Sequence, residues 1–258
     1  MNAKARAIPD RLSFLARQGY AHRGLHRPDG PAENSLPAFA AALETGHGME
    51  CDVRLSADGV PHVFHDARLD RMTQDSGPIA ARTASELAQL PLKQDSGTIP
   101  TLAALLCLIA GRAPLLIEVK IGHRREIRPL CEAVAREIRH FDGQPVDGQL
   151  ARAAIAVMSF HPGVARWFHR FAPAIPHGLV VTEENRKGLS GDLLRHLAMR
   201  YGHPDFLAYD IRDLPSPFAR RQRAKGIPVL SWTVRTAQHW RTVEAEADAA
   251  IFEEEEDR

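Results

Sequence analysis

The chain has 258 residues, of which 44% are hydrophobic and 25% are charged, and its 33 basic and 32 acidic side chains nearly cancel. This length fits one α/β barrel, and the hydrophobic share is enough for a substantial core. The near-zero net charge argues against a surface that coats nucleic acid. Cys51, Cys107 and Cys131 form no Cys-x-x-Cys pair, so neither a disulfide framework nor a zinc knuckle is predicted.

The N-terminus predicts no export and no membrane anchoring. Residues 1–19 alternate charged and small residues and lack the apolar stretch of a secretory signal. The longest apolar run, residues 102–110, is about half of what a membrane span needs. With the cysteine pattern, these features predict a soluble cytoplasmic protein. The oligomeric state is left open.

Short apolar runs in eight places predict β-strands. They cover residues 20–23, 49–55, 114–120, 154–160, 177–181, 206–209, 228–234 and 248–252. Helical patterns with recognisable ends separate them, at residues 35–46, 101–111, 125–140, 164–171, 191–200, 216–225 and 237–247. Such alternation is typical of parallel βαβ units. Eight repeats in this length predict an α/β fold, a closed (β/α)₈ TIM barrel, as a single domain over residues 1–258.

Two segments depart from a regular barrel. A short insertion is expected between the second and third barrel strands, with residues 83–90 as its clearest helix. The chain also leaves no room for a full helix after the eighth strand. We expect an N-terminal helix at residues 11–18 to cover either that side or the barrel floor.

Acidic side chains gather where the predicted strands end. Glu50 and Asp52 lie on the second strand, and Glu118 and Lys120 end the third. Residues two apart on a strand point to one face, and functional groups of barrels lie at the carboxyl ends of strands. Because unpaired buried charge is unfavourable, a divalent cation held by Glu50, Asp52 and Glu118 resolves the conflict. The alternative is a half-exposed strand whose charges point to water.

A predicted hairpin directs a histidine to these carboxylates. Asp58-Gly59 is typical of a two-residue hairpin loop. If those residues form the loop, Ala57 faces Val60 and Asp52 lies opposite His65, with Cβ atoms about 4.5–5.5 Å apart.

His22 and His65 form the predicted acid/base pair, since histidine titrates near neutral pH. The alternative for each is a structural hydrogen bond within a strand. Arg23 follows His22 and suits a phosphate oxygen, while Asp66 can orient the His65 imidazole. His62 has the opposite strand parity and is not expected in the site. In the seventh strand, Trp232 either lines the barrel mouth or fills the barrel.

An ordered set of motifs resembles the glycerophosphodiester phosphodiesterase family over nearly the whole chain. The set is Ala21-His22-Arg23-Gly24, Glu33-Asn34-Ser35, Glu50-Cys51-Asp52-Val53, Asp58-Gly59, His65-Asp66, Ile99-Pro100-Thr101-Leu102, Ile117-Glu118-Val119-Lys120, Ser159-Phe160 and Trp232-Thr233-Val234.

The resemblance implies a (β/α)₈ enzyme that hydrolyses glycerophosphodiesters to glycerol 3-phosphate and an alcohol, usually with Mg²⁺ or Ca²⁺. It implies three groups of site residues: metal ligands Glu50, Asp52 and Glu118; the acid/base pair His22 and His65; and phosphate or substrate contacts from Arg23, Lys120, Glu33 and Trp232. For Glu33 the contact is either the metal or a substrate hydroxyl.

The implied reaction is attack on phosphorus by the neighbouring glycerol hydroxyl, and water then opens the cyclic phosphate. One histidine deprotonates the attacking hydroxyl and the other protonates the leaving alkoxide; which one acts first is left open. The competing interpretations are a lysophospholipase D-like enzyme acting on lysophospholipids and a non-catalytic barrel that only binds phosphate esters.

Overall fold

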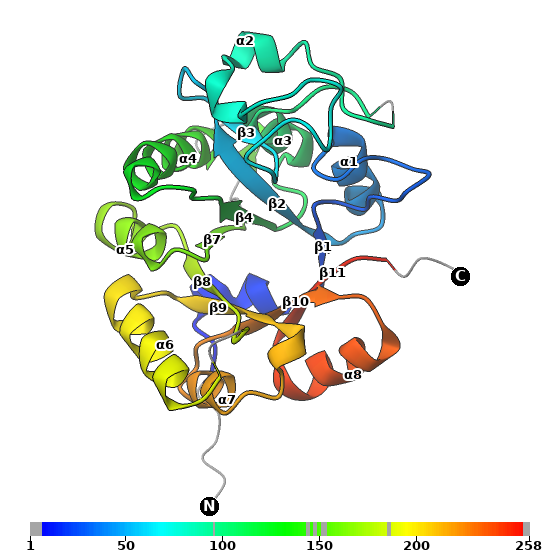
Figure 1. The fold of residues 1–258 in the computed structure, drawn as a ribbon. Helices are drawn as coiled ribbons and strands as arrows, with labels where there is room; N and C mark the ends of the chain where they lie inside the picture. Colours follow the sequence, from blue (N-terminus) through cyan, green and yellow to red (C-terminus); the bar gives the residue numbers. More distant parts are fainter. Residues whose placement is uncertain are drawn as a thin grey trace, which may run out of the picture. The chain divides into compact units, whose positions relative to one another are not determined.

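Strands and helices alternate along the chain in the computed structural model (Figure 1), which describes residues 7–94, 96–142, 145–146, 149–150, 154–184 and 187–254. The chain divides into two compact units. We call residues 21–155 the N-terminal unit, and residues 1–20 together with 156–257 the C-terminal unit.

In the N-terminal unit, parallel strands carry the acidic motifs. Strand β2 (Gly48–Leu55) pairs in parallel with β4 (Leu115–Val119), with Asp52 opposite Glu118. Strand β3 (Pro61–Val63) pairs antiparallel with β2, and β1 (Tyr20–His22) precedes both in the chain. The helices are α1 (Leu36–Glu44), α2 (Ala84–Leu87), α3 (Leu102–Ile109) and α4 (Ile127–Asp142), the last preceded by the 3₁₀ turn η3 (Arg124–Glu126).

Hydroxyl side chains cap helices α1, α2 and α3 of this unit. Ser35 accepts a hydrogen bond from the Ala38 amide at 3.3 Å, and Thr101 accepts one from the Ala104 amide at 3.1 Å. Thr83 and Glu86 form a reciprocal capping box on α2. These caps satisfy amides that have no partner within the helix.

Five parallel strands make the sheet of the C-terminal unit. In order of pairing they are β7 (Ile155–Ser159), β8 (His177–Val181), β9 (Phe206–Asp210), β10 (Val229–Val234) and β11 (Ala249–Phe252). Between them run α5 (Pro162–Phe171), α6 (Leu189–Gly202), the 3₁₀ turn η4 (Ile211–Asp213), α7 (Pro217–Ala224) and α8 (Ala237–Glu246).

All eight predicted barrel strands are present, and each end lies within one residue of its prediction. The antiparallel pair β5 (Pro145–Val146) and β6 (Gln149–Leu150) was not predicted. Two-residue strands are too short for an alternating pattern to be recognised.

The predicted N-terminal helix is a 3₁₀ helix, η1 (Asp10–Ala16). Arg11 donates to Asp205, just before β9 begins, with an Nη1–Oδ2 distance of 3.2 Å. This contact places η1 at the amino end of β9, which favours the barrel floor among the two predicted positions.

The predicted insertion between β2 and β4 has an apolar core of its own. It contains the 3₁₀ turn η2 (Ile79–Ala81) and α2. The buried cluster consists of Ala32, Phe64, Leu69, Met72, Ile79, Leu87, Leu92 and Ile99. Hydrogen bonds from the Ala32 amide to Ser96 Oγ (2.8 Å) and from Gln94 Nε2 to the Pro28 carbonyl (2.6 Å) join the segment before α1 to this insertion.

No helix among the described residues is both long enough and apolar enough to cross a membrane.

Candidate active site

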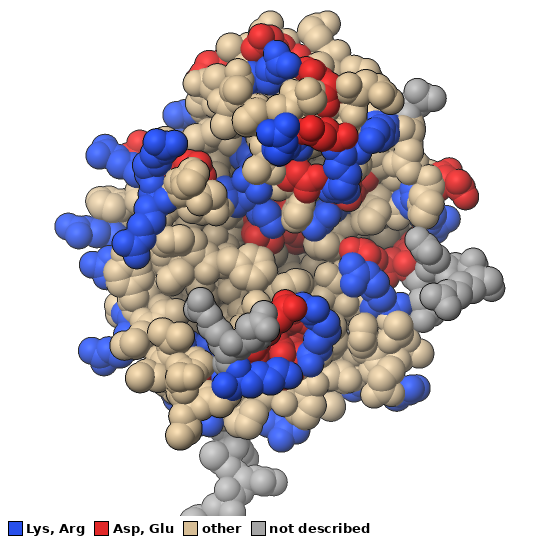
Figure 2. All heavy atoms as spheres, in the orientation of Figure 1, with Lys and Arg blue, Asp and Glu red and all other residues tan. Residues whose placement is uncertain are grey.

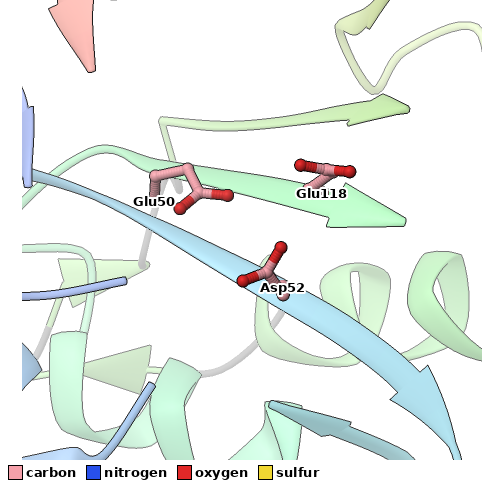
Figure 3. A group of neighbouring side chains, drawn as sticks. All are labelled: Glu50, Asp52 and Glu118. Atoms are coloured by element: carbon pink, nitrogen blue, oxygen red, sulfur yellow. The ribbon is translucent and has the colours of Figure 1, made fainter. Parts of the chain in front are cut away.

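Three carboxylates of the N-terminal unit converge on two neighbouring parallel strands. Acidic and basic side chains crowd the surface over the segment between β2 and α3 (Figure 2). Glu50 and Asp52 come from β2 and Glu118 from β4, and their carboxylate groups point toward one another (Figure 3). One oxygen from each lies within 4.8 Å of the others, and all three residues are buried. We call these residues the carboxylate cluster.

Crowding changes the ionisation of the cluster. Burial, together with the charges of Asp52 and Glu118, raises the pKa of Glu50 well above its usual range. Burial also raises the pKa of Glu118, although Lys120 opposes this shift. Burial opposes the ionisation of Asp52 as well, but the charges of Lys120 and Arg23 outweigh it and lower the pKa of that carboxyl. Without a further cation, the cluster therefore favours an ionised Asp52 and a protonated glutamate.

The charge balance of the cluster suits a divalent cation. With all groups ionised, the cluster, Glu33 and Asp66 carry five negative charges, and Arg23, Lys120 and Arg71 carry three positive ones, which leaves an excess of two negative charges. Glu50 Oε1 is buried and has no hydrogen-bond partner within the described part of the chain. A buried carboxylate oxygen without a partner is costly, and hard cations such as Mg²⁺ and Ca²⁺ bind such oxygens. The residues present therefore fit a divalent metal ion.

A left-handed turn after β1 brings Arg23 to the cluster. Arg23 and Gly24 have φ angles of 58° and 81°, and a Cβ atom at Gly24 would lie 2.8 Å from the backbone carbon of Ala38. Only glycine fits such a position. The turn directs the Arg23 amide to Glu50 Oε2 at 3.1 Å.

The Arg23 guanidinium lies between two carboxylates. Its Nη1 donates to Glu33 Oε1 at 2.9 Å, and its Nε lies 3.1 Å from Asp52 Oδ2. Lys120 is placed similarly on the other side, with Nζ 2.9 Å from Glu118 Oε1 and 3.2 Å from Asp52 Oδ1. Both predicted phosphate-binding cations therefore lie at the cluster.

Asn34 holds Asp52 from a second left-handed position. Its φ is 57°, a conformation in which asparagine is enriched. Asn34 Nδ2 donates to Asp52 Oδ2 at 2.9 Å, and the Asp52 amide donates to Asn34 Oδ1 at 3.2 Å. Ser35, the next residue, caps α1, and the contact of Asn34 with Asp52 was not predicted.

Both predicted histidines belong to this neighbourhood. His22 Nε2 lies 3.9 Å from Glu50 Oε2. His65 Nδ1 lies 2.6 Å from Asp66 Oδ1, as expected for a carboxylate that orients the imidazole. Burial lowers the pKa of His65, while the charge of Asp52 partly opposes this shift. His65 therefore stays neutral to a lower pH than an exposed histidine and can accept a proton near neutrality.

The predicted hairpin register is wrong by one residue. Val53 lies opposite Val63, and the Phe64 amide donates to the Asp52 carbonyl at 2.9 Å, so Phe64 takes the position expected for His65. The reason is a three-residue loop: the Ser56 amide donates to the Val60 carbonyl, and Gly59 has a φ of 81°.

His65 nevertheless lies near Asp52, because β3 ends at Val63 and strand parity no longer applies to the residues after it. Asp52 and His65 influence each other's pKa. His62, which was not expected in the site, is fully buried in β3, and its Nδ1 lies 3.1 Å from the Val60 carbonyl.

Arg71 links the two sides of the site and was not predicted. Its Nε donates to Asp66 Oδ2 at 2.6 Å, and its Nη1 and Nη2 donate to Glu33 at 2.7 Å each. Contacts therefore run from His65 through Asp66, Arg71 and Glu33 to Arg23. Arg71 lies in the insertion, outside any regular pattern, so the sequence offered no signal for it.

Trp232 lies on β10 in the C-terminal unit. Its indole Nε1 donates to the Ala208 carbonyl at 2.9 Å, and its ring meets Phe160 edge to face at 5.4 Å. The ring is only half-buried. These contacts fix the ring within its own unit, and a contact of Trp232 with substrate stays a prediction.

Comparisons with known proteins agree on one family. The model of the glycerophosphoryl diester phosphodiesterase family matches residues 22–254. Curated relatives include a glycerophosphodiester phosphodiesterase of Bacillus altitudinis, 33% identical over 60% of this chain and 63% of its own length. Another, glycerophosphodiester phosphodiesterase 1 of Bos taurus, is 28% identical over 88% of this chain and 73% of its own. The chain spans about three fifths of the length of its relatives from Bacillus altitudinis (63%) and Mycobacterium tuberculosis (61%).

Solved structures of this family have the same fold. A phosphodiesterase of Oleispira antarctica in complex with sn-glycerol-3-phosphate superposes with a TM-score of 0.77 and 23% identity, over 94% of each chain. A glycerophosphodiester phosphodiesterase of Thermotoga maritima superposes with a TM-score of 0.70 and 26% identity, over 90% of this chain and 92% of its own. The predicted (β/α)₈ TIM-barrel fold class is confirmed.

Proposed function

Because the chain belongs to the glycerophosphoryl diester phosphodiesterase family, we propose that it hydrolyses glycerophosphodiesters to glycerol 3-phosphate and an alcohol. The observation that carries this proposal is the carboxylate cluster, which lies between two cations and has His22 beside Glu50. The relatives' names and the product bound to the Oleispira antarctica enzyme support the same activity.

Glu50, Asp52 and Glu118 would hold Mg²⁺ or Ca²⁺. A bound divalent ion supplies positive charge for the non-bridging oxygens of the phosphate. It also makes up for the excess negative charge of the cluster, so that Arg23 and Lys120 can each turn a donor toward the phosphate.

His22 and His65 would move the protons. One takes the proton of the glycerol hydroxyl that attacks phosphorus, and the other gives a proton to the departing alcohol oxygen. Asp66 accepts from His65 Nδ1, which leaves Nε2 as the atom for proton transfer. Water then opens the cyclic phosphate with the roles reversed. Positioned proton transfer contributes about 10²–10⁴ in rate.

The test is release of glycerol 3-phosphate from glycerophosphocholine, glycerophosphoethanolamine and glycerophosphoglycerol, with Mg²⁺, Ca²⁺ or EDTA in parallel. We expect turnover that EDTA abolishes and that either Mg²⁺ or Ca²⁺ restores. Turnover that survives both EDTA and His22→Ala would contradict the mechanism.

Lysophosphatidylcholine in the same panel separates the main alternative. Preference for it over glycerophosphocholine would identify a lysophospholipase D-like enzyme, and no turnover with either metal would favour a barrel that only binds phosphate esters. Trp232 as a substrate contact, one domain over residues 1–258 and the cytoplasmic location stay predictions.

A further inference from the structure

Helix α6 exposes its apolar residues instead of burying them. Leu189, Leu193, Leu197 and Tyr201 follow one another at intervals of four, which aligns them along one side of the helix. Their exposed fractions are 92%, 60%, 51% and 47%, and the neighbouring Leu194 is 47% exposed. We call these five residues the α6 stripe. A surface helix of a globular protein normally turns such a stripe to the core.

Contacts on the opposite side of α6 fix this orientation. Gly191 and Gly202 are buried, and a Cβ atom at Gly202 would lie 3.1 Å from the Pro162 carbonyl oxygen of α5, so the two helices pack closely there. Between the glycines, the Arg195 side chain is 11% exposed, and its Nη2 lies 3.4 Å from Glu183 Oε2. Rotation of α6 to bury the leucines would break these contacts.

Positive charge borders the stripe. Helices α5 and α6 contain three exposed arginines (Arg166, Arg170 and Arg200) and one acidic residue, Asp192, although the whole chain carries a net charge of only +1. The Arg166 guanidinium of α5 lies 4.8 Å from the centre of the Tyr201 ring, and Arg200 is exposed. Asp192 is bound by Arg221 at 2.8 Å. Figure 2 shows a largely uncharged surface over α6 with basic side chains at its border.

We propose that the α6 stripe, with Arg166 and Arg200, docks the protein on the surface of an anionic phospholipid bilayer. Leucine and tyrosine next to arginine are the residues that interfacial helices place at the boundary between headgroups and acyl chains. Each exposed arginine adds attraction to an anionic leaflet.

The charge distribution disfavours a second copy of the chain as the occupant. A two-fold dimer through the stripe would place the same surface against itself, so two patches of the same positive sign would meet. An exposed apolar area of this kind marks an interaction site. The positive charges of Arg166 and Arg200 favour an anionic lipid surface as its partner. This proposal does not depend on the proposed hydrolysis.

Vesicle flotation tests the proposal with the full-length protein. The probes are vesicles of phosphatidylcholine alone and of equal parts phosphatidylcholine and phosphatidylglycerol. We expect binding to the mixed vesicles that weakens with added salt. Leu193→Ser with Leu197→Ser should reduce partitioning about tenfold or more, because two leucines lose apolar contact. Arg166→Gln with Arg200→Gln should reduce it on the mixed vesicles alone.

Two control variants on α8 match these changes. Trp240 is 40% exposed, so Trp240→Ser removes an apolar side chain of similar exposure, and Arg241→Gln removes an exposed charge. Neither should change partitioning by more than about twofold. Equal binding of the wild type and the leucine variant would overturn the proposal. So would a wild-type dimer in sedimentation equilibrium that the leucine variant loses, because that result assigns the stripe to a second copy.

Hydrogen exchange on the wild type keeps the test independent of how the variants fold. Mixed vesicles should slow amide exchange in α6 at residues 189–201 and leave α8 unchanged. Unchanged exchange in α6 while the protein is bound to vesicles would overturn the proposal.

Discussion

Each of the two units carries a charged cluster on its parallel strands, but the clusters differ in how completely their oxygens are bonded. In the C-terminal unit, Asp210 accepts from Arg212 at 2.6–3.2 Å and from Thr182 Oγ1 at 3.3 Å. Asp213 accepts from the Glu183 amide at 2.6 Å. In the N-terminal unit, Glu50 Oε1 is buried without a partner in the described chain. We call Asp210, Asp213 and their partners in the C-terminal unit the Asp210 network.

This difference separates a structural network from a binding site. In the Asp210 network, Glu183 Oε1 also accepts from Ser216 Oγ at 2.7 Å and from the Tyr209 hydroxyl, so arginines and hydroxyls meet the carboxylates directly. The carboxylate cluster instead has more negative charge than its cations balance. Buried carboxylates whose oxygens are all bonded by protein groups therefore stabilise the structure, whereas carboxylates with an unbonded oxygen are suited to bind a ligand.

The largest effect is expected from the histidines of the N-terminal unit. His22→Ala and His65→Ala should each lower kcat by about 10²–10⁴, because each removes a positioned proton donor or acceptor. His140→Ala, an exposed change on α4, is the control and should leave kcat within about twofold. Steady-state release of glycerol 3-phosphate measures all three. A loss below tenfold for both site variants would remove these histidines from the acid/base roles.

Neutral replacement of one carboxylate in each cluster should change the free energy of unfolding in opposite directions. In EDTA, Glu50→Gln should raise the free energy of unfolding by about 1 kcal/mol or more. Because folding raises the pKa of Glu50, the wild type must take up a proton or bury a charge when it folds at neutral pH, and glutamine avoids that cost. Asp210→Asn should lower it by about 1–3 kcal/mol, because charge-assisted hydrogen bonds are lost. Urea titrations followed by circular dichroism measure both.

Added metal ions should mainly stabilise proteins whose carboxylate cluster is intact. Mg²⁺ or Ca²⁺ should stabilise the wild type and Asp210→Asn alike, and should stabilise Glu50→Gln much less. If Glu50→Gln were less stable than the wild type in EDTA, the bonding argument for the carboxylate cluster would be wrong.

Arg71 tests whether orientation of His65 matters. Arg71→Gln should lower kcat about tenfold, a cost typical of losing a group that orients a catalytic side chain. Its exposed fraction of 47% predicts little change in stability. Arg71→Lys should recover only part of the rate, since lysine cannot bridge Asp66 and Glu33 as a fork. A change in KM alone, with kcat kept, would instead assign Arg71 to substrate binding.

The smallest effect concerns His62, three residues before His65. Burial lowers the pKa of this imidazole below its value in the unfolded chain. Its contribution to stability is therefore complete above the unfolded pKa of about 6.5 and is lost as the pH falls below that value. We expect the free energy of unfolding to decrease between pH 7 and pH 5, and to decrease less in His62→Gln, while kcat changes less than threefold at pH 7. Equal slopes with pH in both proteins would exclude His62 as the cause.

The sequence predicted the strands well because each combines a β-rich apolar run with clear boundaries. It also predicted the carboxylate cluster, because the alternation of side chains along β2 and β4 fixes which residues share a face. Both results follow from periodicity within single strands.

Turns and long-range contacts were harder to predict. The hairpin register failed because the Ser56 hydroxyl bonds to Asp58 at 2.6 Å and to the Val60 amide at 3.0 Å, which favours a three-residue loop. Arg71 was missed because its partners Asp66 and Glu33 meet only after the insertion folds. The outward stripe of α6 was missed because apolar spacing shows that a helix has a distinct face and leaves open where that face points.

The apolar core of the insertion has a consequence for exchanging loops between relatives. Residues 56–101 fold around Phe64, Leu69 and Leu87, so substitution of this segment as a whole should preserve its packing. Ala32 belongs to the same core, and Gln94 bonds to the backbone of residues 27 and 28. A transplant of the insertion should therefore move residues 27–34 together with residues 56–101, as one module of two segments with four crossover points.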